Sequence, residues 1–516
     1  MILVDFPVTA FIAGLGGLLF IIQGFRRRTR RPQLPLPPGP RKLPFVGNLF
    51  DLPPAFEWET YLKWSRTLNS DVIHLDLAGT SLIVLSSLDA TDDLLDRRSS
   101  IYSDRAHLPM LIDLMGWGFH FWNNWRNHRR LFSQEFSITG SQKFQPALLA
   151  ASRGLLRRFL DTPDAFRRHI KQMAGEVILG VAYGIKVLPV DDPYIALAER
   201  AVQSAAEASI PGRFMVDAFP LMKYIPEWFP GAKFKRKAKQ WRKFAQDLQD
   251  VPFAEVQRQV TAGIVPPSFA GESLQALNEY APGRTYYDEN TIKGAAASSY
   301  AAGSETTAIA LLTFILAMIA NPEAQKTAQT EIDSVTGGTR LPEFRDEEAL
   351  PYLSALVKEV LRWKAVAPIG VPHFISVEDE YHGYRIPANS IVIGNVWAIL
   401  HHEEMYPEPH TFNPERFLLD GKLNPDVRDP QAAFGFGRRI CPGRYMATSS
   451  LWIAIASILA AFNIGKAIEE DERIIEPSYE YSPGFLSTPL PFKCSIQPRS
   501  KGAVSLILTA GKGDRD

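Results

Sequence analysis

A long and nearly charge-free stretch, DENTIKGAAASSYAAGSETTAIALLTFILAMIANPE at residues 288–323, constrains the fold more than any other feature. Its acidic start and its Asn-Pro end predict a single helix. Between Lys293 and Glu323 the only charged residue is Glu305. A helix that is apolar on all sides must be buried in a large domain or in a membrane. The apolar half, 306–320, has only fifteen residues and no basic flank, which favours a core helix over a second membrane span.

The chain is large enough to build a domain around such a helix. It has 516 residues, 46% of them hydrophobic, and no internal repeat is visible. Helical patterns dominate residues 88–361, whereas strand-like patterns occur at 71–87 and 381–393. We therefore predict one mainly α-helical domain with small β-sheets over residues 41–499. A polar, frayed tail is expected at 500–516.

Charge and cysteine content exclude two broad classes. The 56 basic residues balance the 56 acidic ones, so there is no global electrostatic case for binding nucleic acid. The two cysteines, Cys441 and Cys494, cannot form a disulfide framework. This cysteine content indicates a reducing compartment.

The N-terminus has the pattern of a membrane anchor. Residues 6–25 contain no charge over a length that crosses a bilayer as a helix, and RRRTRR follows at 26–31. We predict a transmembrane anchor at 1–25, a basic and proline-rich linker at 26–40, and a body on the cytosolic side. A cleaved signal peptide is the alternative, but the basic n-region and the Ala-x-Ala cleavage site of such peptides are absent.

The segment FGFGRRICPGR, residues 434–444, combines glycines, arginines and one of the two cysteines. Gly435 and Gly437 can adopt backbone conformations closed to other residues and leave room for a large flat ligand. Pro442 predicts the first position of the following helix. Cys441 would then lie at the helix N-terminus, where the dipole favours a thiolate. A stabilised thiolate beside a planar ligand suggests a soft metal ligand.

The segment also admits four other interpretations. Arg439 adds positive charge beside the thiol, but a dinucleotide fingerprint fails because Ile440 replaces its last glycine. A P-loop would need Gly-Lys-Ser/Thr, which is missing. A nucleophilic cysteine stays open, although the nearest histidine in sequence is His410. A structural cysteine in a turn is the fourth alternative.

The pattern FxxGxRxCxG narrows these alternatives. It is formed by Phe434, Gly437, Arg439, Cys441 and Gly443. It resembles the haem-binding loop of the cytochrome P450 family, whose cysteine-thiolate ligation of haem is established chemistry. The resemblance implies the cytochrome P450 fold, a helical prism around a buried haem.

Four further motifs resemble the same family in the same order along the chain. AGSETT at 302–307 resembles the oxygen-activating turn of the central helix, and WRNHR at 125–129 resembles the WxxxR element. Glu359 and Arg362 match ExxR, and FNPERF supplies Arg416 as their third partner. The resemblance implies a structural ion-pair network, whose loss would abolish haem incorporation. It covers almost the whole chain.

The resemblance implies roles for individual residues. Cys441 would be the axial ligand of a haem b iron and would favour O–O cleavage. The haem propionates would be hydrogen-bonded by Arg439, Trp125, Arg129 and His373, the last within GVPHF. Each of these four could instead be an ordinary surface or core residue.

Glu305 and Thr306 would carry the proton-transfer step. Beside Gly303, a side chain or water could open the helix locally, and the two residues could relay protons toward the haem. The alternative is a surface glutamate and a threonine that bonds back to its own helix.

The implied activity is that of a monooxygenase inserting one oxygen atom from O2 into an apolar or aromatic small molecule. The sequence of these motifs is most similar to that of fungal enzymes of secondary metabolism. This similarity implies a terpenoid or an indole as substrate. No flavin or nicotinamide motif is present, so electrons would come from NADPH-cytochrome P450 reductase, with cytochrome b5 as a further partner. The enzyme would be a single-pass protein of the endoplasmic reticulum membrane. A reductase-independent isomerase or peroxygenase, and a non-catalytic haem sensor, are the alternatives.

Two other clusters have ordinary interpretations. HHEEMYPEPH at 401–410 lacks HExxH, so we expect no metal site there. KFKRKAKQWRKF at 233–244 is either a solvated helix face, which is slightly favoured, or a surface that touches anionic lipid. The segments expected to line the substrate cavity are 117–122, 205–230, 366–371 and Phe485.

Overall fold

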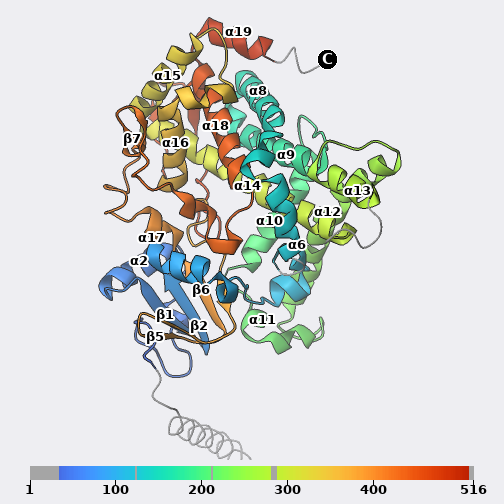
Figure 1. Ribbon diagram of the computed structural model, residues 1–516, viewed down its shortest axis with the longest axis vertical. Helices are drawn as coiled ribbons and strands as arrows, with labels where there is room; N and C mark the ends of the chain where they lie inside the picture. The colour runs from blue at the N-terminus through green and yellow to red at the C-terminus, as the bar shows by residue number, and fades with distance from the viewer. Residues whose placement is uncertain (1–33, 122–124, 211–212, 280–286, 511–516) are drawn as a thin grey trace, which may run out of the picture.

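The computed structural model, shown in Figure 1, describes residues 34–121, 125–210, 213–279 and 287–510. The predicted anchor at 1–25 and the first part of the predicted linker at 26–40 lie outside the described residues. The described part of the linker is fastened to the body. The carbonyl oxygen of Pro35 accepts a hydrogen bond from the N–H group of Arg385 at 2.8 Å, and that of Pro38 accepts one from His74 at 2.9 Å.

The predicted central helix is confirmed as α14, Glu289–Ala320. The Asp288 carboxylate caps it by accepting a hydrogen bond from the N–H group of Thr291 at 2.8 Å. In the described part of the chain, α14 and α18, Arg444–Ala461, are long and apolar enough to cross a membrane. However, 72% and 67% of their most apolar windows are buried inside the protein, which favours two core helices.

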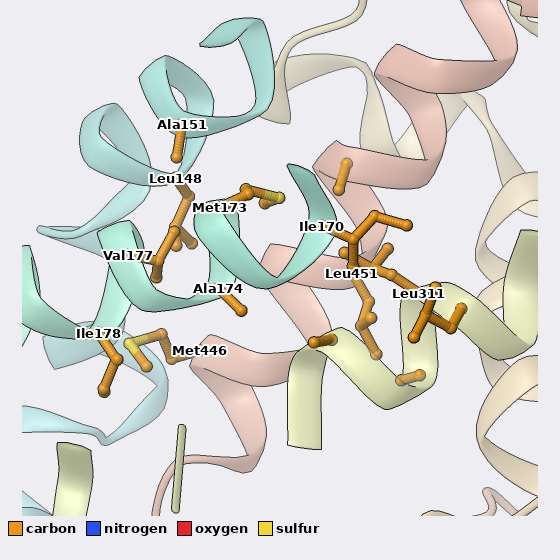
Figure 2. Packing of buried hydrophobic residues seen from close by; sticks show 14 of the residues in the cluster. Leu148, Ala151, Ile170, Met173, Ala174, Val177, Ile178, Leu311, Met446 and Leu451 are labelled. Carbon is orange, nitrogen blue, oxygen red and sulfur yellow. The ribbon is translucent and has the colours of Figure 1, made fainter. Parts of the chain in front are cut away.

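Helices on both sides of α14 bury its apolar surface. Helices α9 and α18 pack directly on it, and α8 lies against both of them. Figure 2 shows side chains from these four helices meeting in one cluster, among them Leu148, Ile170, Leu311 and Leu451. Each large aliphatic side chain buried in this way contributes about 1.5–3 kcal/mol. This core fixes the middle of the molecule, on which the site is built. The bounds are α8 Gln145–Asp161 and α9 Phe166–Tyr183.

The sheets lie at the margin of the helical body (Figure 1), as the sequence predicts. Strands β1, Val72–Leu77, and β2, Thr80–Leu85, form an antiparallel hairpin. Its turn residues Ala78 and Gly79 have φ of 51° and 99°. The four-stranded sheet has the order β1-β2-β6-β3. The remaining strands are β3 His373–Ile375, β4 Asp379–Tyr381, β5 Tyr384–Ile386, β6 Ser390–Gly394, β7 Leu418–Leu419, β8 Lys422–Leu423, β9 Phe462–Ile468, β10 Ile474–Ile475 and β11 Cys494–Pro498.

The other helices surround this core and its sheets. The longer ones are α2 Glu57–Thr67, α6 Trp125–Glu135, α10 Pro193–Ala208, α12 Lys233–Thr261, α13 Phe269–Glu279, α15 Pro322–Thr336 and α16 Pro351–Trp363. The shorter ones include η2 Asp92–Arg97, η3 Met110–Leu114, α5 Gly118–Phe121, α11 Met215–Ala218, η5 Pro220–Tyr224, α17 Val396–Leu400 and η9 Gly437–Arg439.

The prediction of a frayed tail after residue 499 is wrong for nine residues. The chain continues as α19, Lys501–Thr509, which Ser500 caps by accepting a hydrogen bond from the N–H group of Ala503 at 3.1 Å. Ala503 and Ile507 are buried, and α19 packs on α8 and α18. The apolar residues of this segment lie at helical spacing, and a neighbouring surface is available to bury them.

Candidate active site

The predicted ion-pair network is present at the end of α16. Glu359 and Arg362 are both fully buried, with Oε2–Nε and Oε1–Nη2 distances of 2.6 and 2.8 Å. The Nε atom of Arg416 lies 3.3 Å from the same carboxylate. Arg362 also donates hydrogen bonds to the carbonyl oxygens of Leu400 and Pro409. The network therefore ties α16 to the segment that leads into the cysteine loop.

The cysteine loop differs from the prediction at its helical end. Cys441 follows a tight loop in which its N–H group donates to the carbonyl oxygen of Phe434 at 2.8 Å. Helix α18 begins at Arg444 with Gly443 as its N-cap, so the prediction that Pro442 opens the helix is wrong. The turn formed by Pro442 and Gly443 instead directs the Gly443 N–H group at the Cys441 thiol.

The two glycines of the loop have the backbone freedom that the sequence predicts. Their φ angles are 85° at Gly435 and 53° at Gly437. A Cβ atom on Gly437 would lie 1.9 Å from the carbonyl oxygen of Leu95 in η2. Gly437 therefore allows the loop to pack on η2 and does not make room for a flat ligand. The Cβ position of Gly435 has no atom within 4 Å.

The cations that act on the Cys441 thiol are Arg129 and Arg444 and not Arg439, the one that the sequence suggests. Burial raises the pKa of the Cys441 thiol, while the Gly443 N–H group and the cations of Arg129 and Arg444 act to lower it. Arg439, the neighbour in sequence, points elsewhere. A coordinated metal ion deprotonates a thiol outright, so this direction is compatible with a metal ligand.

Arg439 is held between a backbone carbonyl and an aromatic ring. Its Nε atom donates to the carbonyl oxygen of Ser103 at 2.8 Å, and its guanidinium lies 3.7 Å from the ring centroid of Trp125. Its Nη2 atom is buried and has no hydrogen-bond partner among the described residues. Burial lowers the pKa of Arg439 to about 10.

Two more groups from distant parts of the chain join this cluster. Arg105 donates hydrogen bonds of 2.7 and 2.8 Å to two carbonyl oxygens that precede His373. Burial, followed by the charge of Arg439, lowers the pKa of Arg105 to about 9. His373 is buried, with Nδ1 2.8 Å from the carbonyl oxygen of Tyr102. Burial and the charges of Arg105 and Arg439 hold its pKa well below the ordinary value, so the ring is neutral.

Arg129 completes the set at the start of α6. It donates a hydrogen bond to the carbonyl oxygen of Ile440, directly beside the cysteine. Burial and the charge of Arg444 lower the pKa of Arg129. The structure therefore brings together the four predicted residues Trp125, Arg129, His373 and Arg439. Arg105 was missed because no motif surrounds it.

The cluster has the donors that an anionic ligand requires. Arg105, Arg129 and Arg439 are each at least partly buried, and Asp104 is the carboxylate that offsets the charges of Arg105 and Arg439. The buried and unpartnered Nη2 atom of Arg439 needs an acceptor. A planar ligand that carries carboxylates at its edge fits these donors beside the Cys441 thiol, and haem b is such a ligand.

The middle of α14 is accessible although most of the helix is buried. Ala302 is exposed, and Gly303, Glu305 and Thr306 are partly exposed. The predicted local opening of the helix is wrong, because α14 is continuous. Because Gly303 has no Cβ atom, the side chain of Ile178 in α9 can pack against its backbone. A Cβ atom at this position would lie 2.8 Å from the Ile178 side chain. The Thr306 hydroxyl donates to the carbonyl oxygen of Ala302 at 2.9 Å, as the alternative interpretation expects.

Glu305 belongs to a chain of charged groups that leads toward the surface. Its carboxylate lies 3.8 Å from the Nζ atom of Lys171 on α9, which lies 2.8 Å from the carboxylate of Glu199 on α10. Burial raises the pKa of Glu305, while Lys171 acts to lower it and Glu199 to raise it. Lys171 and Glu199 were missed because neither lies in a recognisable motif.

The histidine-rich segment at 401–410 makes structural contacts. The His401 ring stacks on Trp397 at a centroid distance of 3.7 Å and lies 5.1 Å from His410. Glu403 pairs with Arg66 of α2 at 3.0 Å. Within the described ranges, no three metal-ligating side chains form a group that could hold an ion.

Comparison with known proteins places this geometry in context. A family model described as Cytochrome P450 matches residues 37–496. Cytochrome P450 monooxygenase 98 of Postia placenta is 44% identical over 488 residues, which cover 93% of each chain. A cytochrome P450 monooxygenase of Rhodocybe pseudopiperita is 43% identical over 509 residues, covering 97% of this chain and 96% of that protein. The tryptamine 4-monooxygenase of Psilocybe cyanescens is 41% identical over 483 residues, covering 92% of this chain and 95% of that protein. The matched region contains every residue of the site described above.

Proposed function

The chain belongs to the cytochrome P450 family, and from this premise we propose that it is a haem-thiolate monooxygenase that holds haem b through Cys441. The observation that carries the proposal is the group of buried and half-buried cations near Cys441, in which one guanidinium nitrogen of Arg439 is buried and has no hydrogen-bond partner among the described residues. When bound, the haem supplies an iron at which dioxygen is activated, and thiolate donation favours cleavage of the O–O bond.

The chain's own residues hold the cofactor. Arg439, Arg129 and the additional Arg105 present guanidinium groups to the two propionates. The ring of Trp125 supports Arg439 through a cation–π contact, with 3.7 Å between the guanidinium carbon and the ring centroid. His373 is neutral, and its Nδ1–H group donates to the carbonyl oxygen of Tyr102, which fixes the ring beside the arginines and leaves Nε2 only as a hydrogen-bond acceptor. These groups position the haem edge, and the network around Glu359 holds the segment that leads to the thiol.

Glu305 and Thr306 move protons at the middle of α14. A carboxyl whose pKa is raised by burial keeps its proton to higher pH and can act as a general acid. Lys171 and Glu199 connect it to the surface, from which protons arrive. The Thr306 hydroxyl, now bonded to Ala302, can rotate to pass a proton onward. The overall reaction places one oxygen atom of O2 in the substrate and releases the other as water, with two protons and two electrons.

The two electrons come from NADPH through a separate flavoprotein, NADPH-cytochrome P450 reductase, with cytochrome b5 as a second donor. The apolar N-terminal sequence and the basic residues after it support a single-pass anchor in the endoplasmic reticulum membrane, with the catalytic domain in the cytosol. The substrate then approaches from or near the membrane.

The substrate is an apolar or aromatic small molecule of fungal secondary metabolism, either a terpenoid or an indole. Aromatic residues in the segment that packs on α14 support this class. The rings of Trp117 and Phe119 stack there at a centroid distance of 5.3 Å. One relative is named as acting on tryptamine, which supports the indole branch. The experiment is turnover of an indole and a terpenoid panel with NADPH and reductase, with product mass as the readout. Product formation without NADPH would instead favour an isomerase or peroxygenase.

A further inference from the structure

Lys364, the second residue after Arg362 of the ion-pair network, is surrounded by aromatic rings. Its Nζ atom lies 5.1 Å from the ring centroid of Trp397 and 5.5 Å from those of Trp363 and Tyr481. The three rings are buried, and the lysine itself is half-buried. An ammonium within about 6 Å of a ring centroid is attracted by the electron-rich face of the ring. We call these four residues, Lys364 and its three rings, the lysine cage.

The rings hold this charge without the help of an acidic partner. Within the described ranges, no carboxylate forms an ion pair with Lys364, and Glu59 acts on it only from a longer distance. Burial lowers the pKa of Lys364, while the charge of Glu59 acts to raise it and that of Arg362 to lower it. The ammonium therefore depends on the aromatic faces for its stabilisation.

The three rings belong to three different parts of the chain. Trp363 ends α16, and Trp397 lies in α17. Tyr481 begins residues 481–489, which we call the C-terminal loop and which an antiparallel bridge closes at its two ends. The Tyr481 hydroxyl also donates to the Thr313 hydroxyl of α14 at 3.3 Å. The lysine cage therefore joins α16, α17 and the C-terminal loop beside the central helix.

The stretch that follows the cage, residues 366–371, is held by the same elements. We call it the wall segment. The N–H group of Trp397 donates to the carbonyl oxygen of Pro368 at 2.9 Å. The N–H group of Ser487, in the C-terminal loop, donates to the carbonyl oxygen of Val366 at 2.9 Å. A shift of α17 or of the C-terminal loop away from the lysine would therefore displace a backbone contact of the wall segment.

The other end of the wall segment reaches the cations assigned to the cofactor. Arg105 donates hydrogen bonds of 2.7 and 2.8 Å to the carbonyl oxygens of Val371 and Pro372. His373 follows directly, and its ring is fixed on the carbonyl oxygen of Tyr102 at 2.8 Å. The wall segment is thus fastened to the cofactor cations at one end and to the lysine cage at the other.

The wall segment and Phe485 of the C-terminal loop are both expected to line the substrate cavity. We propose that Lys364 is a positioning residue whose charge draws the three rings together and thereby sets the distance between the wall segment and the C-terminal loop. The spacing of these two walls decides which atoms of an apolar substrate face the haem. The inference rests on the proposed function and adds to it a residue that orients the substrate through its neighbours.

The first test needs no substrate and uses hydrogen exchange of the full-length protein. Lys364→Met keeps the aliphatic stem and removes the charge. We expect the amides of the wall segment and the C-terminal loop to exchange about five- to thirtyfold faster. Lys143→Met, which removes a cation 5.1 Å from the single ring of Phe144, should leave these amides unchanged. Wild-type exchange in Lys364→Met would overturn the proposal, because packing of the stem alone would then hold the rings.

The second test separates positioning from stability. The probes are imidazole and 4-phenylimidazole, which bind the iron of the ferric haem protein through a ring nitrogen. Only the second probe carries a further ring that extends toward the cavity walls. In Lys364→Met, 4-phenylimidazole should bind about three- to tenfold more weakly by Soret titration, with imidazole binding and the carbon monoxide spectrum unchanged. Equal weakening of both probes, or of neither, would overturn the positioning role.

Two variants of Tyr481 test whether the effect passes through the cage. Tyr481→Leu should give the same selective loss as Lys364→Met, and the double variant should lose no more than either single one. Tyr481→Phe keeps the ring and should behave like wild type. Additive losses in the double variant would contradict the cage as the link. Absence of a thiolate-type carbon monoxide band in the wild type would refute the proposed function, while hydrogen exchange would still decide the role of Lys364.

Discussion

The buried carboxylate of Glu359 offers a sharp test of how the cysteine loop is supported. The change Glu359→Gln keeps the shape of the side chain and removes its charge. In the structure this carboxylate accepts hydrogen bonds from Arg362 at 2.6 and 2.8 Å, from Arg416 at 3.3 Å and from the Asn413 N–H group at 2.8 Å. A glutamine presents an NH2 group to donors and leaves two buried guanidinium groups without a counter-charge.

Removing one partner of a buried ion pair costs about 3–5 kcal/mol. This is a large part of the roughly 5–15 kcal/mol that stabilises a folded domain. Arg362 and Arg416 donate hydrogen bonds to carbonyl groups of the segment before the cysteine loop. The loss of stability should therefore be seen as loss of bound haem. We expect purified Glu359→Gln protein to contain little haem per polypeptide and to unfold at lower urea concentration.

Glu255→Gln is a matched control. Glu255 and Arg258 have the same three-residue spacing on a helix, at 2.6 Å, but the arginine is 71% exposed. An exposed pair is worth about 0–1 kcal/mol, so this variant should keep its haem and its urea midpoint. If Glu359→Gln keeps full haem content and the wild-type midpoint, the structural role assigned to the network is refuted.

Two further predictions concern protons and backbone geometry. Lys171 acts to lower the pKa of Glu305, so Lys171→Met should raise that pKa further. The alkaline limb of the turnover profile, measured as product formed against pH, should then move to higher pH. A shift of this limb to lower pH would contradict the relay. Gly437→Ala should abolish folded haem protein, because its Cβ would lie 1.9 Å from the carbonyl oxygen of Leu95. Gly435→Ala meets no atom within 4 Å but is strained by its φ of 85° and ψ of −162°, so it should cost about 1–3 kcal/mol and keep the haem. Equal losses in the two variants would contradict this distinction.

Local patterns in the sequence predicted much of the fold. The central helix was expected over 288–323 and is observed as Glu289–Ala320, because charges and an Asn-Pro pair mark its ends. The hairpin at 71–87 follows from alternating apolar residues and an Ala-Gly turn. The Glu359–Arg362 pair follows from the ExxR motif, whose three-residue spacing puts the two side chains on one face of a helix.

Features that depend on distant packing were not predicted. Gly437 is required by the carbonyl of Leu95, which is more than 300 residues away in the chain. Arg105 and Lys171 reach the site from loops and helices whose sequences carry no motif. Helix α18 begins at Arg444 because the Gly443 N–H group turns to the thiol, and propensity at Pro442 cannot reveal that contact.

The most direct test of the central claim is the carbon monoxide difference spectrum of the reduced protein, compared between two cysteine variants. The chain has only two cysteines, Cys441 in the loop and Cys494, buried in β11. We predict the thiolate-type Soret band for wild type and for Cys494→Ser, and its loss in Cys441→Ser. A thiolate-type band that survives in Cys441→Ser would contradict the assignment of Cys441 as the haem ligand.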